Sequence, residues 1–252
     1  MNLDKKQNLQ EEQYYFPYHF IPQWGKDFSQ VIYMSWGYVY RSYIEFVLDL
    51  LKQNPPNKMI DIGCGDGRLI YEINKHLPKV NISGVDYSSG AVGFAKAFNP
   101  KIDLYVGDIS NPSFSVGSYD TATLIETLEH IPPETIDNFV KSIHKILEKE
   151  GRLIITVPST NIPLNKKHYQ HFTLDSLKKT LTPYFCLEEY YYTNTRSISE
   201  NIIKKILNNS LYSIHIGKIN NLLYRYYKKK LFNSNKNNAS RIIGIFKKNS
   251  DL

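Results

Sequence analysis

KMIDIGCGDGR, residues 58–68, joins a short apolar run to three glycines at alternate positions. The apolar part predicts a buried strand, and the glycines predict a tight turn that opens a helix. Glycines in such a turn let backbone N–H groups approach a ligand without a clash from a Cβ atom. Asp61 stands at the end of the strand, directly before the turn. The stretch therefore predicts a strand–turn–helix unit that holds a ligand at its turn.

The chain that follows this unit alternates between strand-like and helix-like segments. Further strands are expected over 81–86, 102–108, 119–125 and 152–158, each separated from the next by a helical pattern or a polar turn. Short apolar strands that alternate with helices pair in parallel and are covered by helices on both faces. Two more strands are expected over 185–193 and 239–248, after a helix that Thr173 could cap. The pattern predicts an α/β fold with a doubly wound, Rossmann-like sheet.

The two ends of the chain differ from this central part in composition. Residues 1–55 are dense in aromatics and predict a helical cap, which the prolines at 55 and 56 end. Residues 56–195 form the expected core, 196–238 a basic helical insertion between the last two strands, and 239–252 the final strand and C-terminus. From Arg196 onward there are 12 Lys and Arg and two acids, so this tail carries a formal charge of +10, residues 1–195 carry −3, and the whole chain carries +7.

The basic tail leaves three interpretations open. One is an interfacial helix pair that meets anionic lipid or a lipid-linked acceptor, and another is an RNA-binding surface. The third is a lid or dimer surface with its charges in water. Two cysteines without a metal-site spacing favour a reducing cytoplasm, and no apolar run approaches the ~18 residues of a membrane span. We expect a cytoplasmic protein, with the tail as its route to peripheral membrane contact.

Acidic residues end three successive predicted strands: Asp61, Asp86 and Asp108. An acid at the end of the second strand is where a carboxylate meets ribose hydroxyls, and the third could face an adenine amino group. A glycine turn without a ligand and a nicotinamide oxidoreductase are the alternatives. Taken together, DIGCGDG, GVDYS, VGDIS and LEKEGRLIITVP resemble the class I S-adenosylmethionine-dependent methyltransferases over residues 58–157.

That resemblance implies a seven-stranded sheet, mostly parallel with the last strand antiparallel, and S-adenosyl-L-methionine as cofactor. Asp61, Gly63 and Gly65 would flank its amino acid part, Asp86 its ribose, and Asp108 with Ile109 its adenine. Glu126 would lie near the methyl group, and Cys64 and Tyr87 complete the expected cofactor-binding set. EKEGR, residues 148–152, departs from the Pro-Gly or Gly-Gly turn usual in relatives, which we expect to affect only the turn before the fifth strand.

TLIETLEHIPP, residues 123–133, places Glu126, Glu129 and His130 where a helical turn would bring them together. The spacing resembles two metal-assisted O-methyltransferase groups, which act on polyprenylated catechols and on the terminal 2′-hydroxyl of small RNAs. The RNA group adds a histidine from the loop after strand five, where this chain has His168 and His171. A divalent metal, Mg²⁺ or Mn²⁺, would have Glu126, Glu129, His130 and His171 as ligands, and the nitrogens favour Mn²⁺, Fe²⁺ or Co²⁺ over Mg²⁺.

Without a metal, Glu126 or His130 would act as general base, which makes these two the expected catalytic residues. The same polar groups could instead line the pocket or cap the following helix. Upstream, Tyr14 or Tyr18 is expected to contact the cofactor pocket. We expect methyl transfer to an oxygen of a small-molecule, glycan or lipid-linked acceptor, with a metal-dependent 2′-O-methyltransferase of RNA as the alternative.

Overall fold

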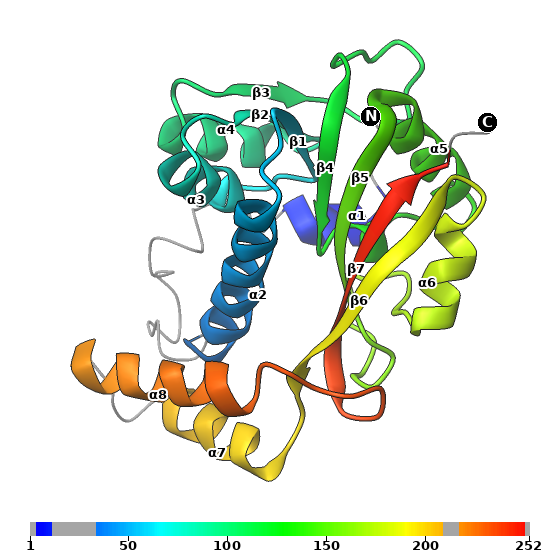
Figure 1. Cartoon of the computed structure of the whole chain (residues 1–252). Helices are drawn as coiled ribbons and strands as arrows, with labels where there is room; N and C mark the ends of the chain where they lie inside the picture. The colour runs from blue at the N-terminus through cyan, green and yellow to red at the C-terminus, as the bar shows by residue number, and fades with distance from the viewer. Residues whose placement is uncertain (1–3, 12–33, 209–216, 250–252) are drawn as a thin grey trace.

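The computed structural model describes residues 4–11, 34–208 and 217–249. Its centre is a seven-stranded sheet with the order β3-β2-β1-β4-β5-β7-β6 (Figure 1). The first five strands pair in parallel, and β7 runs antiparallel to both of its neighbours, as the resemblance implies. The strands are β1 Lys58–Ile62, β2 Asn81–Asp86, β3 Asp103–Val106, β4 Tyr119–Ile125, β5 Leu147–Pro158, β6 Phe185–Thr195 and β7 Ala239–Lys248.

Helices cover both faces of this sheet, as a doubly wound fold requires. Along β5, Ile154 points to a cluster with α2 and α3, whereas Leu153 and Ile155 point to a cluster with α5 and α6. This alternation follows from the two-residue period of a strand. The helices are α1 Lys5–Glu11, α2 Met34–Gln53, α3 Arg68–His76, α4 Ser89–Phe98, α5 Ile136–Ile146, α6 Leu174–Leu181, α7 Ile198–Leu207 and α8 Gly217–Lys230. Thr173 caps α6 in a capping box with Ser176, as its sequence suggests.

The segment EKEGR differs from the expected turn, because β5 already begins at Leu147. Tyr119 of β4 pairs with Leu147 and Thr121 pairs with Arg152, so the extra residues form an irregularity inside the strand. Glu150 takes a φ of +63° there. A bulge absorbs surplus residues without ending the pairing, which is why the strand continues through this segment.

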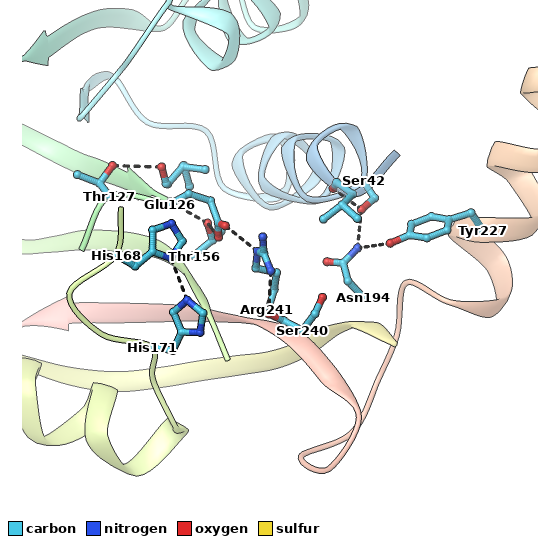
Figure 2. A network of polar contacts seen from close by, with 12 residues as sticks. Ser42, Glu126, Thr127, Thr156, His168, His171, Asn194, Tyr227, Ser240 and Arg241 are labelled. Carbon is cyan, nitrogen blue, oxygen red and sulfur yellow. Dashed lines mark hydrogen bonds and ion pairs between the residues drawn. The ribbon is translucent and has the colours of Figure 1, made fainter. Parts of the chain in front are cut away.

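The two helices α7 and α8 lie between β6 and β7 in the chain and pack beside α2, at the end of the molecule far from β3 (Figure 1). A separate apolar cluster joins them to α2 through Tyr38, Ile203 and Tyr224. Figure 2 shows a buried polar contact at this junction: Asn194 Nδ2 donates to Ser42 Oγ at 2.9 Å and to Tyr227 OH at 2.8 Å. Apolar packing and paired polar groups together fix α8 on α2.

Candidate active site

A cavity of about 480 Å³ lies at the carboxyl ends of the parallel strands, where open α/β sheets bind ligands. Strand pairing explains its lining, since β1 lies between β2 and β4, and β2 pairs with β3. All nine residues expected to bind a cofactor line this cavity: Asp61, Gly63, Cys64, Gly65, Asp86, Tyr87, Asp108, Ile109 and Glu126.

The glycine turn is held by hydrogen bonds to the neighbouring strand. Gly63 N and Cys64 N both donate to the Val85 carbonyl oxygen, at 2.8 and 3.1 Å. Gly63 has a φ of +71°, and a Cβ atom added to it would lie 2.4 Å from Thr127 Oγ1. A side chain at this position would therefore clash as well as strain the backbone. The turn thus brings bare backbone to the edge of the cavity.

The carboxylate of Asp86 organises the same turn from the end of β2. It accepts hydrogen bonds from Gly65 N and from Ser88 N, each at 2.9 Å. Asp108, at the end of the next strand, accepts from Ser110 N at 2.8 Å and from Ser110 Oγ at 2.6 Å. Backbone and hydroxyl donors therefore fix both acids in place.

Asp61 is buried between these acids and β4. Its Oδ1 accepts a hydrogen bond from Thr123 Oγ1 at 2.7 Å. Burial raises the pKa of Asp61 to about 7, and the charge of Asp86 acts in the same direction, against the hydrogen bond from Thr123. The lining of this cavity therefore includes a buried carboxyl group whose pKa is near neutral.

Glu126 leaves the end of β4 with a left-handed φ of +52°. Its carboxylate accepts hydrogen bonds from Thr156 Oγ1 at 3.0 Å and from Arg241 Nε at 2.6 Å (Figure 2). The side chains of this ion pair are only 18% and 13% exposed. Desolvation is the largest single effect and lowers the pKa of Arg241. The charges of Glu126, Tyr43 and Glu129 and the hydrogen bond to Glu126 together outweigh it and raise the pKa, so the guanidinium stays charged. Arg241 has no local sequence motif, and only the pairing of β7 with β5 brings it here.

Breaking this ion pair is expected to destabilise the fold. Arg241→Leu would leave the Glu126 carboxylate buried without its counter-charge, which costs about 3–5 kcal/mol of unfolding free energy. Urea denaturation measures the loss. The double variant Glu126→Gln with Arg241→Leu should lose less than Arg241→Leu alone, because it buries no charge. Lys52→Ala breaks the exposed pair of Lys52 with Asp49 and should change little. A double variant no more stable than the single one would contradict the assignment.

Glu129, His130 and His168 come together in the lining of this cavity. Glu129 and His130 stand in the short 3₁₀ turn Leu128–His130 after β4, and His168 lies in the loop after β5. Tyr169 N donates to the Glu129 carbonyl oxygen at 2.9 Å, which ties this loop to the turn. One potential ligand atom from each of the three side chains lies within 4.8 Å of the others.

Hydrogen bonds fix the tautomers of the histidines. His130 Nδ1 lies 3.2 Å from the Lys167 carbonyl oxygen and His171 Nδ1 lies 3.2 Å from the Ile162 carbonyl oxygen, so both Nδ1 atoms carry a proton. His171 Nε2 then accepts from His168 Nδ1 at 2.8 Å. The lone pairs of His130 and His168 therefore reside on Nε2. Burial lowers the pKa of His130 to about 3 and also lowers that of His168, so both rings are neutral.

The cluster differs from the expected metal-ligand set in two members. His168 takes the place expected for His171. His171 is outside the cluster and is hydrogen-bonded to His168. Glu126 is turned to Arg241 and Thr156 and is outside the cluster. Glu129 is 1% exposed, and this burial raises its pKa well above the ordinary range, with the Glu126 charge adding to the effect. A neutral imidazole pair beside a buried carboxyl group is a donor set that divalent transition metals accept.

The N-terminal helix α1 lies over the loop that carries His168. Lys6 Nζ donates to the His168 carbonyl oxygen and lies 4.8 Å from the centre of the Tyr169 ring. Gln7 lines the cavity. Tyr14 and Tyr18, which were expected to contact the cofactor pocket, lie outside the described residues.

Comparison with known proteins gives related sequences and related folds. The chain is 25% identical over 146 residues to the ubiquinone/menaquinone biosynthesis C-methyltransferase of Geotalea daltonii, which covers 55% of this chain and 61% of that protein. It is 31% identical over 160 residues to the carboxy-S-adenosyl-L-methionine synthase of Campylobacter fetus, covering 54% and 68% of the two chains. The N-methyltransferase NodS from Bradyrhizobium japonicum, solved with S-adenosyl-L-homocysteine, has the same fold, with a TM-score of 0.62, 15% identity and coverage of 98% and 100%.

The family assignment rests on the central part of the chain. The profile of the Methyltransferase domain family matches residues 35–191, which is more than half of the sequence. This range contains α2 except its first residue, the glycine turn, the acids at the strand ends and the Glu129–His130–His168 cluster. The chain belongs to the Methyltransferase domain family.

Proposed function

We propose that this protein transfers a methyl group from S-adenosyl-L-methionine to a hydroxyl oxygen of a small-molecule acceptor that carries a second oxygen beside the first. The observation that supports this proposal is the cluster of Glu129, His130 and His168 in the same cavity as the glycine turn and its acids. The cluster gives the acceptor a binding site beside the cofactor. In this proposal the acceptor is a catechol or another vicinal diol, alone or as part of a glycan or lipid-linked molecule.

The cavity suits the proposed cofactor in size and charge. Its volume of about 480 Å³ is within the usual range of small-molecule sites. Asp61 and Asp86 supply negative charge where a sulfonium compound with an ammonium group would bind. In this assignment Asp61 with Gly63 holds the amino acid part, Asp86 with Tyr87 the ribose, and Asp108 with Ile109 the adenine.

The cluster also suits a divalent cation such as Mn²⁺. Glu129 would supply a carboxylate oxygen, and His130 and His168 would supply their Nε2 lone pairs. The hydrogen bonds from both Nδ1 atoms hold the rings in the tautomer that a ligand needs. A bound cation would lower the hydroxyl pKa of the acceptor and fix its oxygen toward the methyl group.

In this proposal the other side chains of the site align the acceptor with the cofactor and exclude water. The sulfonium is already a good leaving group, so the rate depends on holding the acceptor oxygen in line with the methyl carbon. His130 is a poor general base, because its lowered pKa makes the neutral ring bind a proton weakly. Glu129 Oε2 has no hydrogen-bond partner among the described residues, and in this proposal it accepts a hydrogen bond from the acceptor hydroxyl.

The direct test is methyl transfer to matched acceptors. We expect turnover with a catechol and much less with the corresponding monophenol, and we expect a chelator to abolish it. Mass detection of the methylated acceptor separates this reaction from a reaction that only modifies the cofactor. Equal turnover of the monophenol, or full activity in the chelator, would contradict the role of the cluster.

A 2′-O-methyltransferase of RNA is the second candidate. It is favoured by His168, because a histidine from this loop is the feature that the resembled RNA group adds to Glu129 and His130. The 3′ end of RNA presents a vicinal diol to the same side chains. Periodate-treated RNA, whose terminal diol is destroyed, is the matched control. Methylation of untreated RNA alone would favour this candidate over a small-molecule acceptor.

The raised pKa of Asp61 predicts a pH dependence of cofactor binding. Below about pH 7 the ligand-free carboxyl is protonated, so binding a cationic ammonium must release this proton. The affinity for S-adenosyl-L-homocysteine should therefore fall about tenfold per unit as the pH drops below 7, and level off above it. Calorimetry between about pH 5.5 and 8.5 measures this. Asp61→Asn should bind S-adenosyl-L-homocysteine weakly at every pH. If its affinity changes with pH as steeply as that of the wild type, Asp61 is not the group that causes the pH dependence.

A further inference from the structure

The helices α7 and α8 hold a concentration of exposed apolar side chains. Ile198 is 80% exposed and Leu222 is 68% exposed, although aliphatic side chains of this size are usually buried. Of the large apolar side chains that are exposed in the described part of the chain, more than half lie on these two helices: Ile198, Ile202, Ile219, Leu222 and Tyr226.

These side chains share the outer faces of the two helices. Ile198 and Ile202 are four residues apart on α7, and on α8 Leu222 and Tyr226 follow Ile219 at i+3 and i+7, which places each set on one face. The opposite faces are buried against α2 and against each other: Ile203, Leu207, Tyr224 and Tyr227. The exposed residues are therefore not part of the packing that holds the helices in place.

Basic side chains border the apolar stripe of α8. Lys218, Arg225 and Lys229 are exposed at helical spacing along one border of the stripe, and Lys230 lies on the other. On α7, Lys205 is exposed beside Ile198 and Ile202. The two described helices hold one acid, Glu200, which is buried and paired with Lys204. We call the exposed apolar residues and these bordering cations the α7–α8 surface.

We propose that the α7–α8 surface docks on a bilayer that contains anionic lipid. Exposed aliphatic side chains bordered by lysine and arginine match the boundary between acyl chains and anionic headgroups. None of the helices in the described residues is long and apolar enough to cross a membrane.

The same features disfavour the two other occupants. A second copy in a symmetric contact would place two cationic borders face to face, which costs electrostatic energy. An RNA surface would use the cations and stacking aromatics, and would leave Ile198, Ile202 and Leu222 without a role.

Contacts at the inner faces fix this surface relative to the cavity. Tyr224 OH donates to Glu45 Oε2 at 2.7 Å, and Lys228 Nζ donates to the Ser42 carbonyl oxygen at 2.9 Å. Both acceptors belong to α2, which also sends Tyr40 and Tyr43 to the cavity lining. A docked α7–α8 surface would therefore set the orientation of the cavity on the membrane. This inference does not depend on which acceptor is methylated.

The test is co-sedimentation of the full chain with vesicles of phosphatidylcholine alone or mixed with phosphatidylglycerol. The wild type should bind the mixed vesicles, bind the neutral ones at least about tenfold less, and dissociate in high salt. Lys218→Glu with Arg225→Glu should abolish binding, and Ile198→Ser with Leu222→Ser should reduce it at least about tenfold. Because all four residues are exposed, the variants should unfold at the wild-type temperature.

Matched controls on the far side of the molecule separate this surface from general charge effects. Lys178→Glu with Lys179→Glu changes two exposed lysines on α6, and Val106→Ser removes an exposed apolar residue from β3. Both should bind like the wild type. Binding that is equal in all variants, or absent in the wild type, would overturn the proposal. A dimer in light scattering that Leu222→Ser dissociates would replace the membrane by a second copy, and salt-dependent binding to RNA alone would replace it by nucleic acid.

Discussion

His130→Ala is expected to lower the rate of methyl transfer on the order of a thousandfold, while the affinity for S-adenosyl-L-homocysteine stays within about twofold. A ring nitrogen of His130 lies within 4.8 Å of a ligand atom of Glu129 and of His168, whereas the cofactor contacts are assigned to residues at the glycine turn and the strand ends. Removing one of three donors should therefore disturb the acceptor and spare the cofactor. Single-turnover rates with a catechol, together with calorimetric titration of S-adenosyl-L-homocysteine, measure the two effects separately.

His76→Ala is the matched control, because His76 is an exposed histidine on α3, away from the cavity lining. It should leave both measurements unchanged. If His130→Ala turns over as fast as the wild type, the cluster has no role in the reaction and serves only to pack the loop after β5.

Asp86→Ala is expected to weaken the binding of S-adenosyl-L-homocysteine by at least about a hundredfold. The carboxylate accepts from Gly65 N and Ser88 N, and hydrogen bonds to a charged group contribute about 1.5–3 kcal/mol each. Its loss both loosens the glycine turn and removes the proposed ribose contact. Calorimetric titration measures the change in dissociation constant.

Asp103→Ala tests whether the effect is specific to the cavity. Asp103 begins the neighbouring strand β3 at the opposite end of the sheet from Asp86 and is exposed. Its loss should not change the affinity. If Asp86→Ala binds like the wild type, the ribose assignment is wrong, and the glycine turn does not depend on this carboxylate.

The sequence predicts most of this fold because its strands are short, apolar and bounded by turn residues. The expected strand over 119–125 coincides with β4, and 239–248 coincides with β7. The start of β5 was missed because EKEGR contains residues of low strand propensity that fit only as a bulge. Pairing with β4 and β7 overrides local preference there, and no window of sequence contains that information.

The candidate site was predictable where it depends on strand ends. Asp61, Asp86 and Asp108 each follow an apolar run, so their convergence follows from parallel pairing alone. The choice of His168 over His171 could not be made in this way, because it depends on how Tyr169 N and the Ile162 carbonyl oxygen fix the loop. The role of Arg241 could not be predicted for the same reason. Arg241 lies in β7 and Glu126 follows β4, and these two strands are far apart in the sequence.

The most direct test of the proposed cluster is calorimetric titration of Mn²⁺ into protein saturated with S-adenosyl-L-homocysteine, comparing the wild type with His168→Ala and His171→Ala. We predict saturable binding in the wild type, loss of that binding in His168→Ala, and a reduction of about ten- to a hundredfold in His171→Ala, which only orients His168. Absence of binding in the wild type, or binding that survives His168→Ala and is lost in His171→Ala, would contradict the assignment of Glu129, His130 and His168 as a metal site.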